Sequence, residues 1–188
     1  MLTTAQLQTL KADIAANTNT INGVQIKDMP NSGDANFAIA KWYSQTATPD
    51  FYVWRSNVSR ADIYNSIDRA GNSWDWTTYK NQGVTEQNAW VQMFMGDQAN
   101  FNQLNVRVGI GKIFTGSAAA NAQRDHCLAV GSRLALRIEK LFASAVVNPP
   151  ANTGNASGDA LGATTNPALL GFEGTVSSDD IEAARSIV

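Results

Sequence analysis

Apolar residues recur at helical spacing over most of the 188-residue chain, and capping or turn residues separate the runs. Near the start, Thr3 and Gln6 form a capping box, and an apolar face follows at Leu7, Leu10 and Ile14. We therefore expect a first helix that ends near residue 16 or 17. The same spacing predicts further helices that begin after residue 34, after residue 59 and near residue 85.

The helical spacing breaks at two segments, and a third segment is open to two interpretations. Residues 51–55 are aromatic and β-branched, which favours an extended segment or a tight link between helices. Residues 106–111 carry two glycines, so we expect a strand, a bulge or a turn there. The aromatic residues within 74–79 either pack under a loop or face a partner. Core packing is favoured, because large aromatic side chains are mostly buried.

The last third of the chain carries the clearest pattern. Apolar residues between 117 and 146 recur at steps of three and four over a wide arc, which predicts one long amphipathic helix buried on more than one side. Residues 147–171 are rich in proline and glycine and hold a single charge, Asp159, so this segment buries too little apolar area to become ordered by itself. Ser177 and Asp180 then form a capping box for a short final helix.

These elements predict a mainly α-helical protein. We expect a small helical bundle with one long helix in its C-terminal half, short extended segments, and a flexible C-terminal arm that ends in a short helix. Residues 1–146 are expected to form the helical domain and residues 147–188 the extended arm. Such an arm, following a helix with a wide apolar arc, is typical of a subunit that completes its fold on neighbouring chains.

Composition narrows the possible partners. Charged residues make up 16% of the chain, below the roughly 25% typical of soluble domains, so we expect much of the surface to be neutral or covered by other chains. The net charge of −2 gives the whole chain no attraction for nucleic acid or anionic membranes. No apolar run approaches the roughly 20 residues that span a bilayer, and no charged leader precedes an apolar core. We therefore expect a soluble protein made in the cytoplasm, with no membrane contact.

The residues that catalysis needs do not occur in a usable arrangement. His126 and Cys127 are the only residues of their kinds, and as neighbours on a helix they diverge by about 100°, which prevents a nucleophile and base pair. Gly111 and Gly116 have the spacing of a phosphate loop, but Ser117 follows where a lysine is needed. We therefore predict that the protein is not an enzyme, with no catalytic residues, no metal site and no cofactor.

Charged side chains suggest where subunits meet. Basic residues follow one edge of the predicted long helix at Arg133, Arg137 and Lys140. They can cover the core, face solvent or meet acidic groups of a neighbour. The chain after residue 146 carries five acidic residues and one arginine, so the helix and the tail can pair within one subunit or between two. We expect the subunit interface to include this basic edge and residues in or before the final helix, namely Phe172, Glu173, Asp179, Asp180 and Ile181.

Four short blocks carry a resemblance to known proteins. They are TTAQLQTLK at residues 3–11, VWRSNV at 53–58, EKLFA at 139–143 and GFEGTV at 171–176. In this order they resemble a family of small tailed-bacteriophage proteins encoded among head and tail structural genes. The helical layout is also similar to that of head-to-tail connector proteins, also called adaptor or neck proteins, which form a ring beneath the portal.

The resemblance implies a virion structural protein of the neck, at the head-tail interface, made in the host bacterial cytoplasm. The implied partners are further copies of the chain in a ring, commonly twelvefold in such proteins, together with the portal protein and tail proteins. DNA would pass close to the subunits in the channel. Two alternatives stay open: another virion role, as a capsid-associated or tail-completion protein, and a small hydrolase or nucleic-acid enzyme that uses His126 or an acidic pair.

Overall fold

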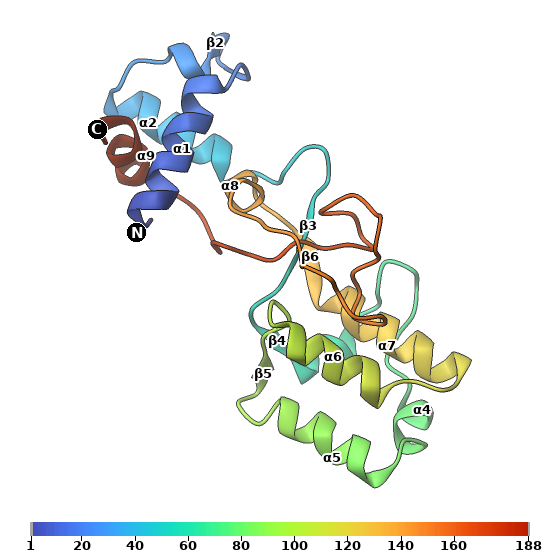
Figure 1. Cartoon of the computed structure of the whole chain (residues 1–188). Helices are drawn as coiled ribbons and strands as arrows, with labels where there is room; N and C mark the ends of the chain where they lie inside the picture. Colours follow the sequence, from blue (N-terminus) through green and yellow to red (C-terminus); the bar gives the residue numbers. More distant parts are fainter. Residues whose placement is uncertain (1, 188) are drawn as a thin grey trace. The chain divides into compact units, whose positions relative to one another are not determined.

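The computed structural model describes residues 2–187 and is mainly α-helical, with short two-stranded antiparallel sheets. This confirms the predicted fold class in its coarse form. The chain divides into two compact units, which Figure 1 shows. Unit 1 contains the described chain up to Pro49, Ala135–Ala143, and the described chain from Gly171 onward. Unit 2 contains Asp50–Leu134 and Ser144–Leu170. The predicted boundary after residue 146 therefore does not match, because both ends of the chain belong to unit 1.

Unit 1 is built on helices that the sequence largely predicts. They are α1 (Thr4–Ala16), α2 (Gly33–Tyr43), α8 (Arg137–Leu141) and α9 (Ser178–Ser186), with strands β1 (Thr20–Ile21) and β2 (Val24–Gln25) and a 3₁₀ turn, η1 (Ile26–Asp28). The predicted capping boxes are present at both ends of the unit, at Thr3 with Gln6 and at Ser177 with Asp180. These caps satisfy backbone N–H groups that a helix start leaves without partners.

The core of unit 1 joins the two ends of the chain. Figure 1 shows α9 lying against α1 and α2. Ile181 and Ala184 of α9 are fully buried, and they share one hydrophobic cluster with Leu10, Ile39 and Ile138. The final helix therefore packs within its own chain, and the prediction that it belongs to an arm that docks elsewhere is wrong.

Unit 2 holds the remaining elements. They are strands β3 (Tyr52–Trp54), β4 (Val58–Ser59), β5 (Gln98–Ala99) and β6 (Ser132–Leu134), and helices α3 (Arg60–Asn65), α4 (Trp76–Lys80), α5 (Val84–Met93), α6 (Leu104–Ile113) and α7 (Ala118–Val130). β3 pairs with β6, and β4 pairs with β5, both antiparallel. The core is strongly aromatic, with Trp54, Trp90, Phe94, Phe101 and Phe114 buried in one cluster.

The predicted long helix from residue 117 to 146 is wrong, because it is broken after α7. Gly131 ends α7, and the Phe101 ring packs so close to it that a Cβ atom there would come within 2.0 Å. Residues 132–134 then form β6, and α8 follows as a separate short helix. The apolar positions serve two cores, with Cys127 in that of unit 2 and Ile138 in that of unit 1. The pairing of β6 with β3 outweighs the helical spacing.

The glycine-bearing stretch at 106–111 was predicted to leave the helical conformation, yet it lies inside α6. Both glycines allow close packing of this helix. A Cβ atom at Gly111 would come within 2.6 Å of the carbonyl oxygen of Asn152, and one at Gly109 within 2.8 Å of the Met93 side chain. A glycine inside a helix costs about 1 kcal/mol relative to alanine. At Gly109 and Gly111 the close contacts leave no room for a larger side chain, so glycine is accommodated within this helix in spite of that cost.

The segment 147–171 is predicted to be mobile by itself, but its residues up to Leu170 belong to unit 2 and are hydrogen-bonded to it. Ala168 pairs with β3 on both sides: its N–H donates to the Tyr52 carbonyl at 2.9 Å, and its carbonyl accepts from the Trp54 N–H at 3.0 Å. Asn155 is buried and donates to Asn166 Oδ1 at 2.9 Å and to the Pro167 carbonyl at 2.8 Å. Side-chain and backbone hydrogen bonds therefore order a segment that has few apolar residues.

Replacing Asn155 with alanine is expected to loosen this segment. The change leaves the buried Pro167 carbonyl and the half-buried Asn166 side chain without this donor, and an unsatisfied buried acceptor costs about 1–3 kcal/mol. Limited proteolysis should then cleave within residues 147–170 several-fold faster than in the wild type. Ser157→Ala, at an exposed position of the same segment, is the matched control and should leave the cleavage rate unchanged. Equal cleavage of Asn155→Ala and wild type would contradict the described packing.

Candidate functional site

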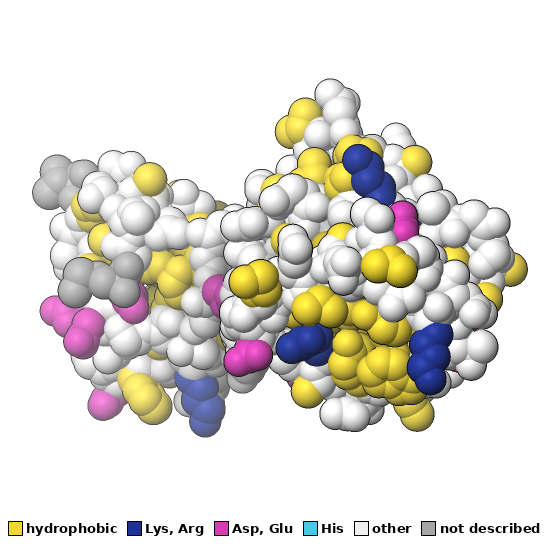
Figure 2. All heavy atoms as spheres, turned by 90° about the horizontal axis from the view of Figure 1, so that it is seen from below, with side chains coloured by type: hydrophobic (Ala, Val, Ile, Leu, Met, Phe, Trp, Pro, Cys, Tyr) yellow, Lys and Arg dark blue, Asp and Glu magenta, His cyan; other side chains and the backbone are white. Residues whose placement is uncertain are grey.

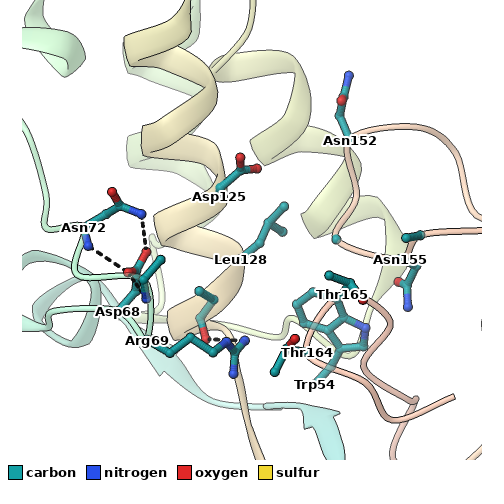
Figure 3. A pocket seen from close by; sticks show the side chains of 14 residues that line it. Trp54, Asp68, Arg69, Asn72, Asp125, Leu128, Asn152, Asn155, Thr164 and Thr165 are labelled. Carbon is teal, nitrogen blue, oxygen red and sulfur yellow. Dashed lines mark hydrogen bonds between the residues drawn. The ribbon is translucent and has the colours of Figure 1, made fainter. Parts of the chain in front are cut away.

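A cleft of about 490 Å³ opens on unit 2. Its walls come from the turn at residues 68–72, from α7, and from residues 152–165. Figure 3 shows Asp125 and Leu128 projecting from α7 toward the segment that carries Asn152, Thr164 and Thr165. The polar groups that line the cleft are amides, hydroxyls, carboxylates and the guanidinium of the exposed Arg69, so the cleft offers hydrogen bonds to a polar ligand.

The turn at residues 68–72 is held by the buried carboxylate of Asp68. This carboxylate accepts hydrogen bonds from the N–H groups of Ala70 and Asn72 at 2.9 and 2.8 Å, and from Asn72 Nδ2 at 3.1 Å. Burial by itself raises the pKa of Asp68, but the hydrogen bonds from Asn72 and Ala70 and the nearby His126 outweigh it, and the pKa lies below its ordinary value. Asp68 is therefore an ionised structural anchor of the cleft wall.

His126 lies behind this wall and is fully buried. Its Nε2 is 2.9 Å from the Ile63 carbonyl, and because a carbonyl only accepts, Nε2 carries a proton. Its Nδ1 lies 3.6 Å from Asp68 Oδ2. Both ring nitrogens therefore face protein groups, and neither is available to a ligand in the cleft. Next to it, burial raises the pKa of the Cys127 thiol far above its ordinary value, so Cys127 packs as a small apolar residue.

Asp68→Asn is expected to destabilise the protein by about 1–3 kcal/mol at pH 7, because an amide accepts fewer of the donors that converge on the carboxylate. The folded-state pKa of Asp68 is lowered from 3.8, so its stabilising contribution is present above about pH 4 and is lost as the pH falls through the folded value. Denaturation at pH 7 and pH 3 should show the difference from wild type shrinking at the lower pH. Asp125→Asn, on the exposed side of the same cleft, is the control and should change stability by less than about 0.5 kcal/mol.

A buried cation supports the cleft from the other side. The Arg107 guanidinium is fully buried, stacks over the Trp54 ring at 4.5 Å and donates to the Phe101 carbonyl. It also lies 3.4 Å from Asn155 Oδ1. Burial lowers the pKa of Arg107 to about 10, so it stays charged at neutral pH. Arg107 thus joins α6, β3 and the segment after residue 147 beneath the cleft.

In unit 1, three of the four sequence blocks described above, at residues 3–11, 139–143 and 171–176, meet at one junction. Gln6 in the first block donates to the Gly171 carbonyl at 3.0 Å. The buried Glu139 carboxylate accepts from the Gly174 N–H at 3.0 Å and from the Leu136 N–H at 2.8 Å. The rings of Phe142 and Phe172 also pack edge to face, with centroids 5.8 Å apart. Residues of these three blocks therefore form one structural joint.

The basic edge predicted on the long helix does not form. Arg133 lies on β6 in unit 2, whereas Arg137 and Lys140 lie on α8 in unit 1. The reason is the break after α7, which removes the common helix face. Arg137 stacks on the Trp42 ring at 4.2 Å and donates to Gln45 Oε1 at 2.7 Å. Arg137 and Lys140 help line a second cleft, of about 640 Å³, in unit 1.

The other predicted interface residues lie in unit 1. Phe172 is half-buried, Glu173 and Asp179 are exposed, and Asp180 caps α9. Ile181 is fully buried in the core, so its assignment to a subunit interface is corrected. The sequence pattern explains the error, because an apolar residue on a short helix looks the same whether it faces its own chain or another.

An apolar stripe that the sequence analysis missed runs along the outer face of α5. Val84 is 74% exposed, Val91 46% and Met95, just beyond the helix end, 79%. Val84 and Val91 are seven residues apart and so lie on one side of α5, and Met95 is exposed just beyond its C-terminal end, while Trp90 and Phe94 are buried in the core. Figure 2 shows that hydrophobic side chains reach the surface at several places on one face of the molecule, some of them gathered between basic side chains. Exposed apolar patches of this kind mark interaction surfaces.

A second exposed feature is aromatic. Trp76 on α4 is 51% exposed and lies among the rings of Tyr64, Trp74 and Tyr79, with centroid distances of 4.9, 5.6 and 6.0 Å. Of the aromatic residues at 74–79, Trp74 is buried, as the favoured interpretation predicts, whereas Trp76 faces outward. Unit 2 therefore presents both an aliphatic and an aromatic surface.

Within residues 2–187, no group of three or more His, Cys, Asp or Glu side chains is arranged to hold a metal ion. In the same part of the chain, no helix has both the length and the hydropathy to cross a bilayer. Comparison of the chain with protein-family models, with curated proteins and with solved structures finds no match in any of the three.

Proposed function

We propose that the protein is a structural subunit of a tailed-bacteriophage virion, at the neck between head and tail. In this proposal several copies form a ring, commonly twelvefold in such proteins, which binds the portal protein on one side and tail proteins on the other. The ring leaves a channel through which DNA passes. The subunit contributes binding surfaces and no catalysis.

The observation that carries the proposal is the apolar stripe of Val84, Val91 and Met95 on α5. Three large apolar side chains exposed on and just beyond one helix are a poor arrangement for a monomer, since covering them with protein stabilises by roughly 25 cal/mol per Å² of apolar surface. A ring repeats such a contact at every subunit boundary, so a modest area at each boundary is sufficient for a stable closed assembly.

The phage assignment is supported by the sequence blocks and by their arrangement. The blocks at residues 3–11, 139–143 and 171–176 are far apart along the chain but share one joint around Glu139. Packing and hydrogen bonds at this joint give the residues of these blocks a structural role. Such a role is consistent with a family resemblance whose blocks contain no catalytic motif.

The proposal is tested with the purified chain and the portal protein encoded in the same genome. Size-exclusion chromatography with light scattering should give a mass of several subunits, and a larger complex when portal is added. A chain that remains monomeric at high concentration and does not bind portal would count against the neck role.

A further inference from the structure

The second cleft, of about 640 Å³ in unit 1, has one wall made by α8. Its other walls come from the C-terminal ends of α1 and α2 and from residues that follow each of them. Figure 1 shows α8 beside the C-terminal end of α2. The volume lies within the roughly 300–1,000 Å³ of small-molecule sites, and the lining combines apolar side chains with a few charged ones, as such sites do.

Arg137 on α8 is held in a fixed orientation at this cleft. Its guanidinium stacks over the Trp42 ring at 4.2 Å, and its Nη1 donates to the Trp42 carbonyl at 3.2 Å and to Gln45 Oε1 at 2.7 Å. These two acceptors use both hydrogens of Nη1. Stacking and hydrogen bonds therefore fix the plane and the direction of the guanidinium before a ligand binds.

The other edge of the same guanidinium is open. Among the residues that the structure describes, no acceptor bonds to Nε or Nη2 of Arg137, and neither atom is one of the buried polar atoms without a partner, so both reach solvent. Nε–H and Nη2–H form the fork that a carboxylate accepts with its two oxygens. Because Arg137 lines the cleft, the cleft carries a preformed site for a planar oxyanion.

The charges around Arg137 select the kind of anion. Lys140 lines the cleft one turn further along α8 and adds a second positive charge, while Asp13 on α1 adds a negative one. The Asp13 carboxylate accepts a hydrogen bond from the buried Tyr43 hydroxyl, and burial and this bond raise the pKa of Tyr43, so the proton stays on Tyr43. Two positive charges against one negative suit a singly charged anion, whereas a phosphate dianion would also be repelled by Asp13.

We propose that this cleft binds a carboxylate carried on an aliphatic chain, with both carboxylate oxygens on the Nε–H and Nη2–H of Arg137 and the aliphatic part beside Trp42 and Leu141. A free small molecule and the Glu side chain of a protein share this chemistry. The site belongs to unit 1, whereas the α5 stripe belongs to unit 2. The proposal therefore goes beyond the proposed function and does not depend on it.

Titration of the ¹⁵N-labelled full chain with sodium butyrate, followed by nuclear magnetic resonance, tests the site. The Arg137 Nε–H and Trp42 indole signals should shift to saturation with a Kd on the order of 1–10 mM, as expected for two charge-assisted hydrogen bonds. The butyrate methyl group should show a nuclear Overhauser effect to the Trp42 ring. Shifts that do not saturate, or that sodium chloride of the same ionic strength reproduces, would overturn the proposal.

A substitution tests the role of the fork. Arg137→Lys keeps the charge but removes the fork, so it should weaken butyrate binding at least about tenfold. Lys41→Gln removes a charge from an exposed position of α2 that does not line the cleft, and it should leave the Kd within about twofold of wild type. Circular dichroism checks that both variants fold. If Arg137→Lys does not, the Overhauser effect in the wild type decides, whereas a folded Arg137→Lys that binds butyrate as tightly as wild type would overturn the proposal.

Inorganic phosphate tests the choice of anion. It should bind the wild type more weakly than butyrate does, because Asp13 repels the second charge. Asp13→Asn removes the negative charge of the lining and should tighten phosphate binding several-fold. Phosphate that binds the wild type more tightly than butyrate would overturn the carboxylate assignment.

A blocked peptide separates the two sources of the carboxylate. The probe is acetyl-Ala-Glu-Ala-amide, and the peptide with Gln in place of Glu is its control. Binding at least about tenfold tighter than butyrate, and lost with Gln, supports the proposal with a protein side chain as the ligand. Butyrate that binds as tightly as the peptide supports it with a free small molecule. Equal binding of the Glu and Gln peptides, together with no saturable binding of butyrate, would overturn it.

Discussion

Ile181→Asp is expected to unfold unit 1, with a loss of about 4 kcal/mol or more in stability. Ile181 is fully buried in the cluster that joins α9 to α1 and α2. The substitution removes apolar contacts, which costs about 2–5 kcal/mol for a large aliphatic side chain, and it also buries a charge without a partner. Urea denaturation followed by circular dichroism should show the lower stability.

The matched control is Ala183→Asp, which adds the same side chain to the exposed face of the same helix. It should alter stability by less than about 0.5 kcal/mol. If Ile181→Asp and Ala183→Asp have the same small effect, α9 does not pack on its own chain, which would contradict the described core of unit 1.

The second large effect is expected on assembly. The triple substitution of Val84→Thr, Val91→Gln and Met95→Gln should weaken self-association roughly 100-fold. Each side chain contributes about 1 kcal/mol when covered at an interface, and 1.4 kcal/mol corresponds to a tenfold change in Kd. Because all three side chains are exposed in the chain itself, thermal stability of the monomer should hardly change. Analytical ultracentrifugation over a concentration series measures the change.

Val24→Thr on β2 is the control for this experiment, since Val24 is 45% exposed, close to the 46% of Val91, but lies in unit 1. It should leave self-association unchanged. If the triple variant assembles as well as wild type, the stripe on α5 is not an interface and the observation that carries the proposed function fails.

The local signals in the sequence were sufficient for three of the helix starts. The capping boxes at Thr3, Ser59 and Ser177 each begin a helix. A capping box depends only on residues within one turn, so its effect can be inferred from the sequence alone. The mainly helical fold class follows from these starts and from the apolar spacing between them.

Non-local contacts explain the errors. The break after Val130 depends on the contact of Gly131 with Phe101 and on the pairing of β6 with β3, two segments about 80 residues apart along the chain. Likewise, Asn155 orders the segment after residue 147 by bonding to groups that the sequence does not show to be near. Strand pairing and buried hydrogen bonds of this kind override local propensity.

The candidate surfaces were only partly predictable. The spacing of Val84, Val91 and Met95 was visible in the sequence, but Trp90 and Phe94 also fit a helical stripe, and only the structure separates the inward face from the outward one. The basic edge at Arg133, Arg137 and Lys140 depended on a continuous helix that does not exist. Of the predicted interface residues, those exposed on unit 1 stay predictions.

Cryo-electron microscopy of purified phage particles that encode this chain, with a label fused to the protein, tests the central claim most directly. The account predicts label density at a single vertex, in a ring between portal and tail. Label spread over the capsid lattice, or particles that assemble and infect without the protein, would contradict the neck assignment.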